Sequence, residues 1–271
     1  MRAAVVGHVE WIEFVEVEAV PLPGEIVAAS SSWEEVGGGG SVAALQLMKL
    51  ADTVLFFTAL GVDELGRRAK ADLEEQGVEV RASFVDAPQR RGVVFVDDAG
   101  ERTITTIGPK LHPRGHDDSL PWHELARCDA LYFCAGDADA LVNARRARVL
   151  VATARELATL RRAGVELDAL IGSAKDDAEA YRPGDLEPEP RLVVSTSGAL
   201  GGWSRPGGPY SAAPPPRPVV DTYGAGDCFA AGLAFALGAG LERAEALEFA
   251  ARCGAAALTG PGVHVEAVPL P

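Results

Sequence analysis

Short apolar runs alternate along most of the chain with segments whose apolar residues recur at helical spacing. The runs at 3–9, 53–58, 129–136 and 191–198 are typical of buried strands, and the segments after 53–58 and 129–136 are typical of helices. Strands that alternate with helices are joined by right-handed crossovers, so this order predicts a parallel sheet with helices on its faces. We therefore expect an α/β fold, with a mostly parallel sheet inside a three-layer αβα arrangement.

Two segments depart from this rhythm. From residue 10 onward apolar and acidic residues alternate, which is typical of a strand with one face in water. Such a strand does not belong in the middle of a parallel sheet that is covered on both faces. Residues 80–108 are also rich in strand patterns, and the runs on either side of 98–101 predict a hairpin. We expect about 10–36 and 80–108 to form a small β-sheet lid on a single domain that spans 1–271.

Composition and charge narrow the class of protein. The chain has 271 residues, 48% of them hydrophobic, and a formal net charge of −14 at pH 7. Nucleic acids and anionic membrane surfaces are bound through cationic groups, so this charge argues against both partners. The four cysteines form no C-x-x-C pair and have apolar neighbours, which predicts buried free thiols. No signal pattern or apolar stretch of roughly 18 residues occurs, so we expect a cytoplasmic protein.

The string DTYGAGD at 221–227 lies where a β-branched run gives way to helical spacing, which predicts a strand, a tight glycine turn and a helix. The first N–H groups of a helix have no intrahelical partner and lie at the positive end of its dipole. Ala225, Gly226 and Asp227 would therefore offer donors to an anion. A side chain at Gly224 or Gly226 would block its approach. Asp227 is then either a helix-capping residue or, beside a bound phosphate, a general base for the attacking group.

This string resembles the C-terminal signature of the ribokinase-like sugar kinases, also called the PfkB carbohydrate kinase family. The resemblance implies a ribokinase-like, Rossmann-like fold. It also implies transfer of the γ-phosphoryl group of ATP, bound with Mg²⁺, to a hydroxyl of a sugar or sugar-like small molecule. In this reading Asp227 is the catalytic base, and the backbone of 225–227 is the anion hole. No G-x-x-x-x-G-K-[ST] string occurs, so the helix N-terminus would replace the Walker lysine.

The glycines at 37–40 precede a helical segment and resemble the family's N-terminal Gly-Gly motif, which acts as a hinge between sugar and lid. By this resemblance, Gly37, Gly38 and Ser41 contact the substrate together with Asp227. Taken alone, four glycines are also typical of a flexible linker.

The sequence departs from the family at two sugar-binding positions. The family's Asp falls on Ile12 and its Asn on Val42, which puts ordinary furanose recognition in doubt. Glu10 is the nearest acid on the face of Ile12, and it is either the substitute or a solvated edge residue. Three basic residues in or beside the expected lid are candidates to meet an anionic substrate: Arg90, Arg91 and Arg102.

The resemblance also implies positions for nucleotide and cations. The nucleotide contacts are Thr196, Ser197, Gly198, Gly201 and Gly226. The family's Asn-x-x-Glu, which orders Mg²⁺ through water, has a weak counterpart in Ser173 and Asp176, and Asp176 is either an outer-shell ligand or a helix cap. Many relatives hold a monovalent cation such as K⁺ through backbone carbonyls, and the matching positions are Asp221, Tyr223, Ala257, Gly260 and Gly262.

Three other functions fit parts of the pattern. A nucleoside kinase of the same fold would stack a base on a lid aromatic such as Trp11, Phe14 or Trp33. A non-catalytic sugar- or nucleotide-binding sensor would have no use for the Asp227 carboxylate. A dinucleotide-dependent oxidoreductase would need a third glycine where Phe229 stands. The sequence identifies neither the acceptor nor the oligomeric state, although the free edges of the lid make a homodimer through the lids a hypothesis.

Overall fold

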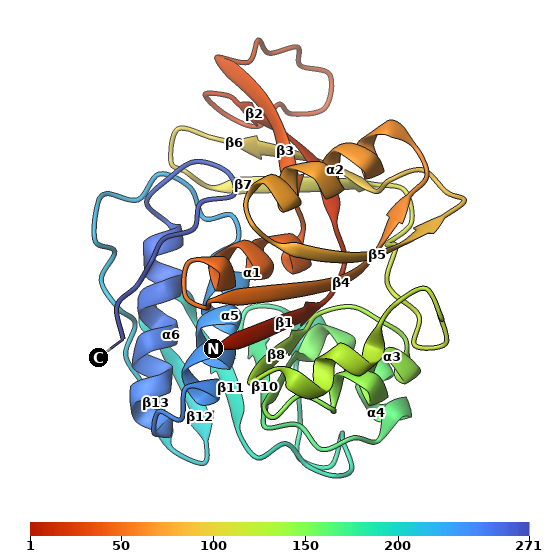
Figure 1. Cartoon of the computed structure of the whole chain (residues 1–271). Helices are drawn as coiled ribbons and strands as arrows, with labels where there is room; N and C mark the ends of the chain where they lie inside the picture. Colours follow the sequence, from red (N-terminus) through yellow and green to blue (C-terminus); the bar gives the residue numbers. More distant parts are fainter. Residues whose placement is uncertain (271) are drawn as a thin grey trace.

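The structure is a computed structural model that describes residues 1–270. It contains a nine-stranded sheet flanked by helices and a separate four-stranded sheet that stands over one end of it (Figure 1). Within residues 1–270, no helix is both long and apolar enough to cross a membrane.

The large sheet is mostly parallel, as predicted. Its strand order is β13-β12-β11-β10-β9-β8-β1-β4-β5, and only β12 and β13 pair antiparallel, at one edge. The inner strands are buried on both faces, which explains their nearly continuous apolar runs. The strands are β1 (Arg2–Val6), β4 (Thr53–Gly61), β5 (Glu79–Val85), β8 (Ala130–Phe133), β9 (Leu150–Thr153), β10 (Ala169–Ser173), β11 (Val193–Thr196), β12 (Gly202–Arg205) and β13 (Gly208–Tyr210).

Helices cover both faces of this sheet, so the three-layer prediction is confirmed. Alternate residues of β1 enter two different cores: Ala3 and Val5 face one, Ala4 and Val6 the other. The first core packs against α1 (Gly39–Met48), α2 (Glu64–Glu75), α5 (Ala225–Gly238) and α6 (Arg243–Ala257). The second packs against η1 (Trp122–Arg127), α3 (Ala138–Ala144) and α4 (Leu157–Ala163). Three short 3₁₀ turns are η2 (Ala154–Glu156), η3 (Asp177–Glu179) and η4 (Gly198–Leu200).

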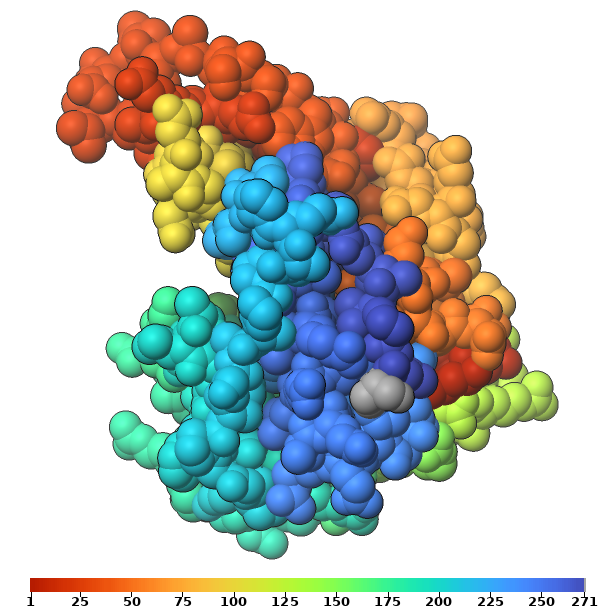
Figure 2. Space-filling model, turned by 90° about the vertical axis from the view of Figure 1, so that its left-hand side faces the viewer, coloured from red at the N-terminus to blue at the C-terminus, as the bar shows by residue number. Residues whose placement is uncertain are grey.

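The small sheet is the predicted lid. Its strands lie in the order β3-β2-β6-β7, and β6 and β7 form the expected hairpin. Their bounds are β2 (Glu10–Glu16), β3 (Ser31–Gly37), β6 (Arg91–Val96) and β7 (Arg102–Ile107). In Figure 2 the molecule is hollowed beneath the yellow β6–β7 hairpin, which overhangs the body and meets the light-blue loop that leads to α5.

Two local predictions were wrong. Residues 80–85, expected in the lid, belong to β5, which pairs parallel with β4 at the edge of the large sheet. Alternation along a strand shows which face is buried but does not name the neighbouring strand. Residues 219–220, expected to end a strand, lie outside any strand. Four prolines between 214 and 218 lack the N–H donor that a sheet ladder requires.

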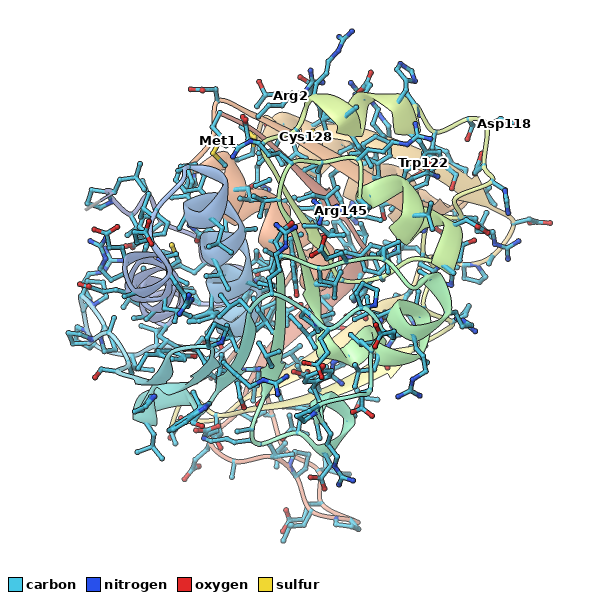
Figure 3. All side chains as sticks on the ribbon, turned by 90° about the horizontal axis from the view of Figure 1, so that it is seen from below. Met1, Arg2, Asp118, Trp122, Cys128 and Arg145 are labelled. Carbon is cyan, nitrogen blue, oxygen red and sulfur yellow. The ribbon has the colours of Figure 1, made fainter. Side chains whose placement is uncertain are left out.

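The cysteines are free and buried, as predicted. Cys128 lies beside Arg2 at the end of the molecule away from the lid (Figure 3). Burial raises the pKa of its thiol to about 11, so it remains protonated at neutral pH.

Candidate active site

The turn before α5 has the backbone that the sequence predicted. Gly224 has a φ of 74°, and a Cβ there would lie 2.8 Å from Val42 Cγ1, so the position requires glycine. Because α5 begins at Ala225, the N–H groups of 225–227 lie at its positive end. A Cβ placed on Gly226 would meet no described heavy atom within 4 Å. The start of α5 is therefore open to solvent at Gly226.

Asp227 is half-buried in this turn, and its surroundings adjust its acidity. Burial raises the pKa of its carboxyl to about 6. The charges of Arg102 and Arg155 lower this pKa, and those of Glu179 and Glu10 raise it. At neutral pH the carboxylate is mostly ionised, yet it is more basic than an exposed Asp, which suits a group that accepts a proton.

The glycine loop lies directly against this carboxylate. A Cβ on Gly39 would be 2.7 Å from Asp227 Oδ1, so a side chain at this position would displace the carboxylate. Gly38 has a φ of 86°, and its N–H donates to Tyr223 Oη at 2.9 Å across 185 positions of sequence. The loop is therefore packed and hydrogen-bonded, unlike a flexible linker. Ser41 is completely buried in α1, and its contact with a substrate stays a prediction.

Glu10 is a buried residue, so the prediction of a solvated edge residue was wrong. It is only 7% exposed, and its Oε1 lies 2.7 Å from Arg90 Nε and 3.8 Å from His8 Nε2. Burial raises the pKa of Glu10, although Arg90 and Lys110 oppose this. The sequence did not single out His8, which follows β1 at the carboxyl end of the sheet, where open α/β sheets bind ligands. Burial, together with Lys110 and Arg90, lowers the pKa of His8 to about 3, so it is neutral.

The two positions that depart from the family are core residues. Ile12 and Val42 are 0% and 1% exposed and belong to one apolar cluster with Phe14 and Tyr223. Polar groups of an acceptor therefore have no partner at either position.

The lid aromatics are also part of packed structure. Phe14 is buried and stacks on Trp33 with ring centroids 5.0 Å apart, and Trp11 is buried beneath Arg68. Trp11 and Phe14 are therefore not free to stack on a nucleoside base, whereas Trp33 is half-buried and packs against Phe14.

Two further charged residues that the sequence did not single out, Arg155 and Glu179, lie just after β9 and β10. Arg155 Nη2 bonds to Asp176 Oδ2 at 2.6 Å and also to Glu179. Asp176 caps η3 through the N–H of Ala178, so the cap interpretation of Asp176 is confirmed. Glu179 is the more buried acid and raises the pKa of Asp227. Asp176 and Glu179 have the spacing of the family's Asn-x-x-Glu motif. This match could have been found from the sequence, in place of the match of Ser173 and Asp176.

Four of the residues implied for the nucleotide lie together where β11 ends and its loop to β12 begins, and the fifth, Gly226, lies in α5. Ser197 N donates to Gly201 O at 2.7 Å, and a Cβ on Gly201 would lie 2.1 Å from Tyr210 O. Thr196 ends β11, and Gly198 has a φ of 61°. The two glycines let this loop turn sharply at the same edge of the sheet as β10.

The two loops implied for a monovalent cation are joined by one buried side chain. Asp221 accepts the N–H of Tyr223 at 2.8 Å through Oδ1 and that of Gly262 at 2.9 Å through Oδ2. Ala257 ends α6, and Gly260 follows in the same loop. The predicted carbonyl positions are thus neighbours in space, while the cation itself stays a prediction.

Comparisons with known proteins identify the family of this chain. The profile of the pfkB family carbohydrate kinases matches residues 2–183 and 145–269. An ATP-dependent ribose-1-phosphate kinase of Halopiger xanaduensis is 28% identical over 94% of this chain and 91% of its own length. An acarbose 7(IV)-phosphotransferase of an Actinoplanes species is 41% identical over 29% of this chain and 28% of its own. A microbiome-derived acarbose kinase has the same fold, with a TM-score of 0.80 at 24% identity over 97% of this chain and 94% of that one.

Proposed function

Because the chain belongs to the pfkB family of carbohydrate kinases, we propose that Asp227 is the general base with which this ATP-dependent sugar kinase activates its acceptor hydroxyl. The observation that carries the proposal is the position of Asp227: its carboxylate lies at the open N-terminus of α5, against Gly39 of the glycine loop. A carboxylate beside a phosphate site repels the phosphate, and a role as proton acceptor accounts for its presence there.

The proposed reaction is an in-line transfer. Asp227 accepts the proton of the acceptor hydroxyl, whose oxygen forms a bond to the γ-phosphorus while the bond to the bridging β-γ oxygen breaks and ADP leaves. The N–H groups of 225–227 stabilise charge on the equatorial phosphate oxygens. Closing the lid excludes water, which would otherwise accept the phosphoryl group.

We also propose which residues contact the nucleotide and its metal ion. Thr196, Ser197, Gly198 and Gly201 would contact the nucleotide, with Gly226 facing its phosphates. Asp176 and Glu179 would hold the nucleotide's Mg²⁺ through water, since carboxylate and water oxygens are its usual ligands, and the metal would neutralise phosphate charge. A K⁺ ion would bind carbonyls at 221, 223, 257, 260 and 262.

We further propose that the acceptor carries an anionic group. The polar side chains closest to Glu10 are Arg90 and His8, and Lys110 acts on both Glu10 and His8. Because His8 is neutral, Arg90 and Lys110 supply the positive charge here, in a chain with a net charge of −14. The relative from Halopiger xanaduensis, named as a ribose-1-phosphate kinase, points to the same class of acceptor.

A panel of matched acceptors tests the class. ADP release from MgATP should be faster with ribose 1-phosphate or another phosphosugar than with ribose, fructose, nucleosides or acarbose. Arg90→Gln should raise KM for the phosphosugar by roughly tenfold or more, since a hydrogen bond to a charged group contributes about 1.5–3 kcal/mol. Arg91→Gln, an exposed neighbour in the same lid, is the matched control.

The outcomes of this panel separate the hypotheses. Faster turnover of a neutral sugar would contradict the anionic acceptor and leave the kinase in place. Turnover of nucleosides alone would favour the nucleoside kinase. Binding of ATP without turnover of any acceptor would favour the non-catalytic sensor.

A homodimer through the lid is also proposed. β7 is an edge strand, and all six of its residues are exposed. Two of them, Ile104 and Ile107, are large and apolar. The loop between β2 and β3 exposes Leu22 and leaves Ile26 100% exposed. Burying these side chains against a second copy removes apolar surface from water.

Sedimentation at micromolar concentration measures this directly. We expect a dimer for the wild type and a monomer for Ile26→Asp combined with Ile104→Asp. Val142→Asp, which alters an exposed apolar residue of α3 far from the lid, should leave the dimer intact. A wild-type monomer would contradict the proposal.

A further inference from the structure

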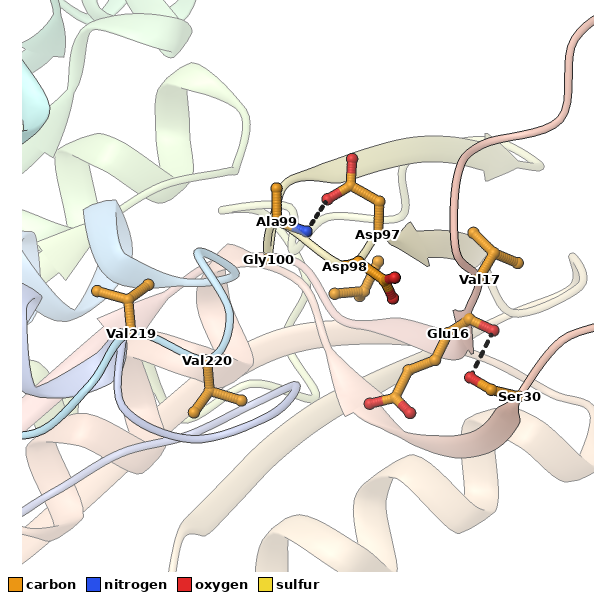
Figure 4. Close-up of a pocket in the computed structure, with 10 residues that line it drawn as sticks. Glu16, Val17, Ser30, Asp97, Asp98, Ala99, Gly100, Val219 and Val220 are labelled. Atoms are coloured by element: carbon orange, nitrogen blue, oxygen red, sulfur yellow. Dashed lines mark hydrogen bonds between the residues drawn. The ribbon is translucent and has the colours of Figure 1, made fainter.

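The tip of the β6–β7 hairpin touches the loop that leads into the catalytic turn. Figure 4 shows residues 97–100 of the hairpin facing Val219 and Val220. A Cβ on Gly100 would lie 2.9 Å from Val220 O, so the two backbones approach closely. The lid therefore rests on the segment just before the anion hole.

Arg102 makes the polar contact next to this tip. It begins β7, and its Nη1 donates to Thr222 Oγ1 at 2.7 Å and also to the Thr222 carbonyl oxygen. Thr222 belongs to the string that ends at Asp227. A side chain of the lid thus holds the backbone of the catalytic turn.

The positive charge of Arg102 lowers the pKa of the Asp227 carboxyl. Four charged groups act on Asp227 from four elements: Glu10 of β2, Arg102 of β7, Arg155 of η2 and Glu179 of η3. Arg155 is already ion-paired with two carboxylates. The hydrogen-bond partners of Arg102 are a hydroxyl and a carbonyl, which are uncharged, so its positive charge is not neutralised by them. Among these four groups its effect on Asp227 is the largest.

We propose that Arg102 is a positioning residue that couples closure of the lid to the catalytic base. With the lid on the body, Arg102 fixes Thr222 and places a positive charge beside Asp227, which keeps the carboxylate ionised. When the lid lifts, Arg102 releases Thr222, so the turn that carries the base is held in place only over a covered acceptor. The inference rests on the proposed role of Asp227, and it explains how attack by water on ATP in the open site is restrained.

Titration of Asp227 tests this coupling without turnover. The full chain, labelled with ¹³C in its Asp carboxyl groups, is titrated by NMR, and Asp227→Asn identifies the signal. An opposite charge nearby lowers a carboxyl pKa by about 1–3 units, so Arg102→Gln should raise the pKa of Asp227 by about one unit. Arg91→Gln removes the same charge from the same sheet and should leave it unchanged. An unchanged pKa in Arg102→Gln would overturn the proposal.

The pH dependence of turnover is the second readout. A rise of the base pKa from about 6 to about 7 lowers its ionised fraction about fivefold at pH 6 and only slightly at pH 8. Arg102→Gln should therefore lose kcat mainly on the acid side, and Arg102→Lys should recover part of the loss. A loss that is equal at all pH values would indicate a purely structural role and overturn the coupling. If no acceptor turns over in the wild type, the proposed function fails while the titration still reports on Arg102.

Discussion

Asp227→Asn should lower kcat by about 10²–10⁴-fold, the usual cost of removing a general base. Asn has the same shape, and its Oδ1 can keep the position that lies against Gly39, so the turn should stay folded. The affinity for ATP should be retained or should increase, because a negative charge next to the phosphate site is removed. Steady-state kinetics with the acceptor from the panel and titration calorimetry with ATP measure the two quantities.

The matched control is Asp137→Asn. Asp137 also lies at the N-terminus of a helix, where its Oδ1 accepts the N–H groups of Ala140 and Gly115. Asn keeps that oxygen, and the residue is not part of the site, so activity and stability should change little. If Asp227→Asn stayed within twofold of the wild type, Asp227 would be a helix-start residue and a different group would have to act as base.

Two glycine-to-alanine variants should reduce activity for opposite structural reasons. Gly226→Ala should fold at least as stably as the wild type, because Ala in a helix is more favourable than Gly by about 1 kcal/mol. Its methyl group nevertheless enters the open space in front of the N–H groups of 225–227. Loss of one such donor costs about 10²–10³-fold in kcat, and we expect a loss of this order.

Gly224→Ala should instead destabilise the fold. Its left-handed backbone costs a residue with a Cβ about 1–2 kcal/mol. The contact with Val42 adds an overpacking cost of about 1–3 kcal/mol. Each kcal/mol lowers Tm by about 2–4 °C in a chain of this size. Thermal unfolding and ATP kinetics on both variants provide the test, and full activity in Gly226→Ala would show that no phosphate lies at this helix end.

The local features of the site were predictable because a few neighbouring residues determine them. Gly224 has the positive φ that a glycine turn predicts, and α5 starts at Ala225 as the change to helical spacing indicated. The β6–β7 hairpin was likewise predictable, since alternation acts over a few positions. These features also carried the resemblance that led to the family.

Other features depend on segments that are distant in sequence. The alternation of residues around Glu10 is typical of an exposed strand. In the fold, however, Glu10 is buried and faces Arg90 and His8. Pairing with β4 placed β5 in the large sheet, because the alternation of a strand is compatible with either sheet.

The sequence by itself determined the three-layer fold, the lid hairpin, the glycine turn and the acid at the start of α5. Only the tertiary structure decided that Glu179 and Arg155 act on that acid from the body and Arg102 from the lid. The physical reason is that turns, caps and periodicity depend on short-range sterics and hydrogen bonds. The acidity of a buried carboxylate depends on charges that only the completed fold brings near it.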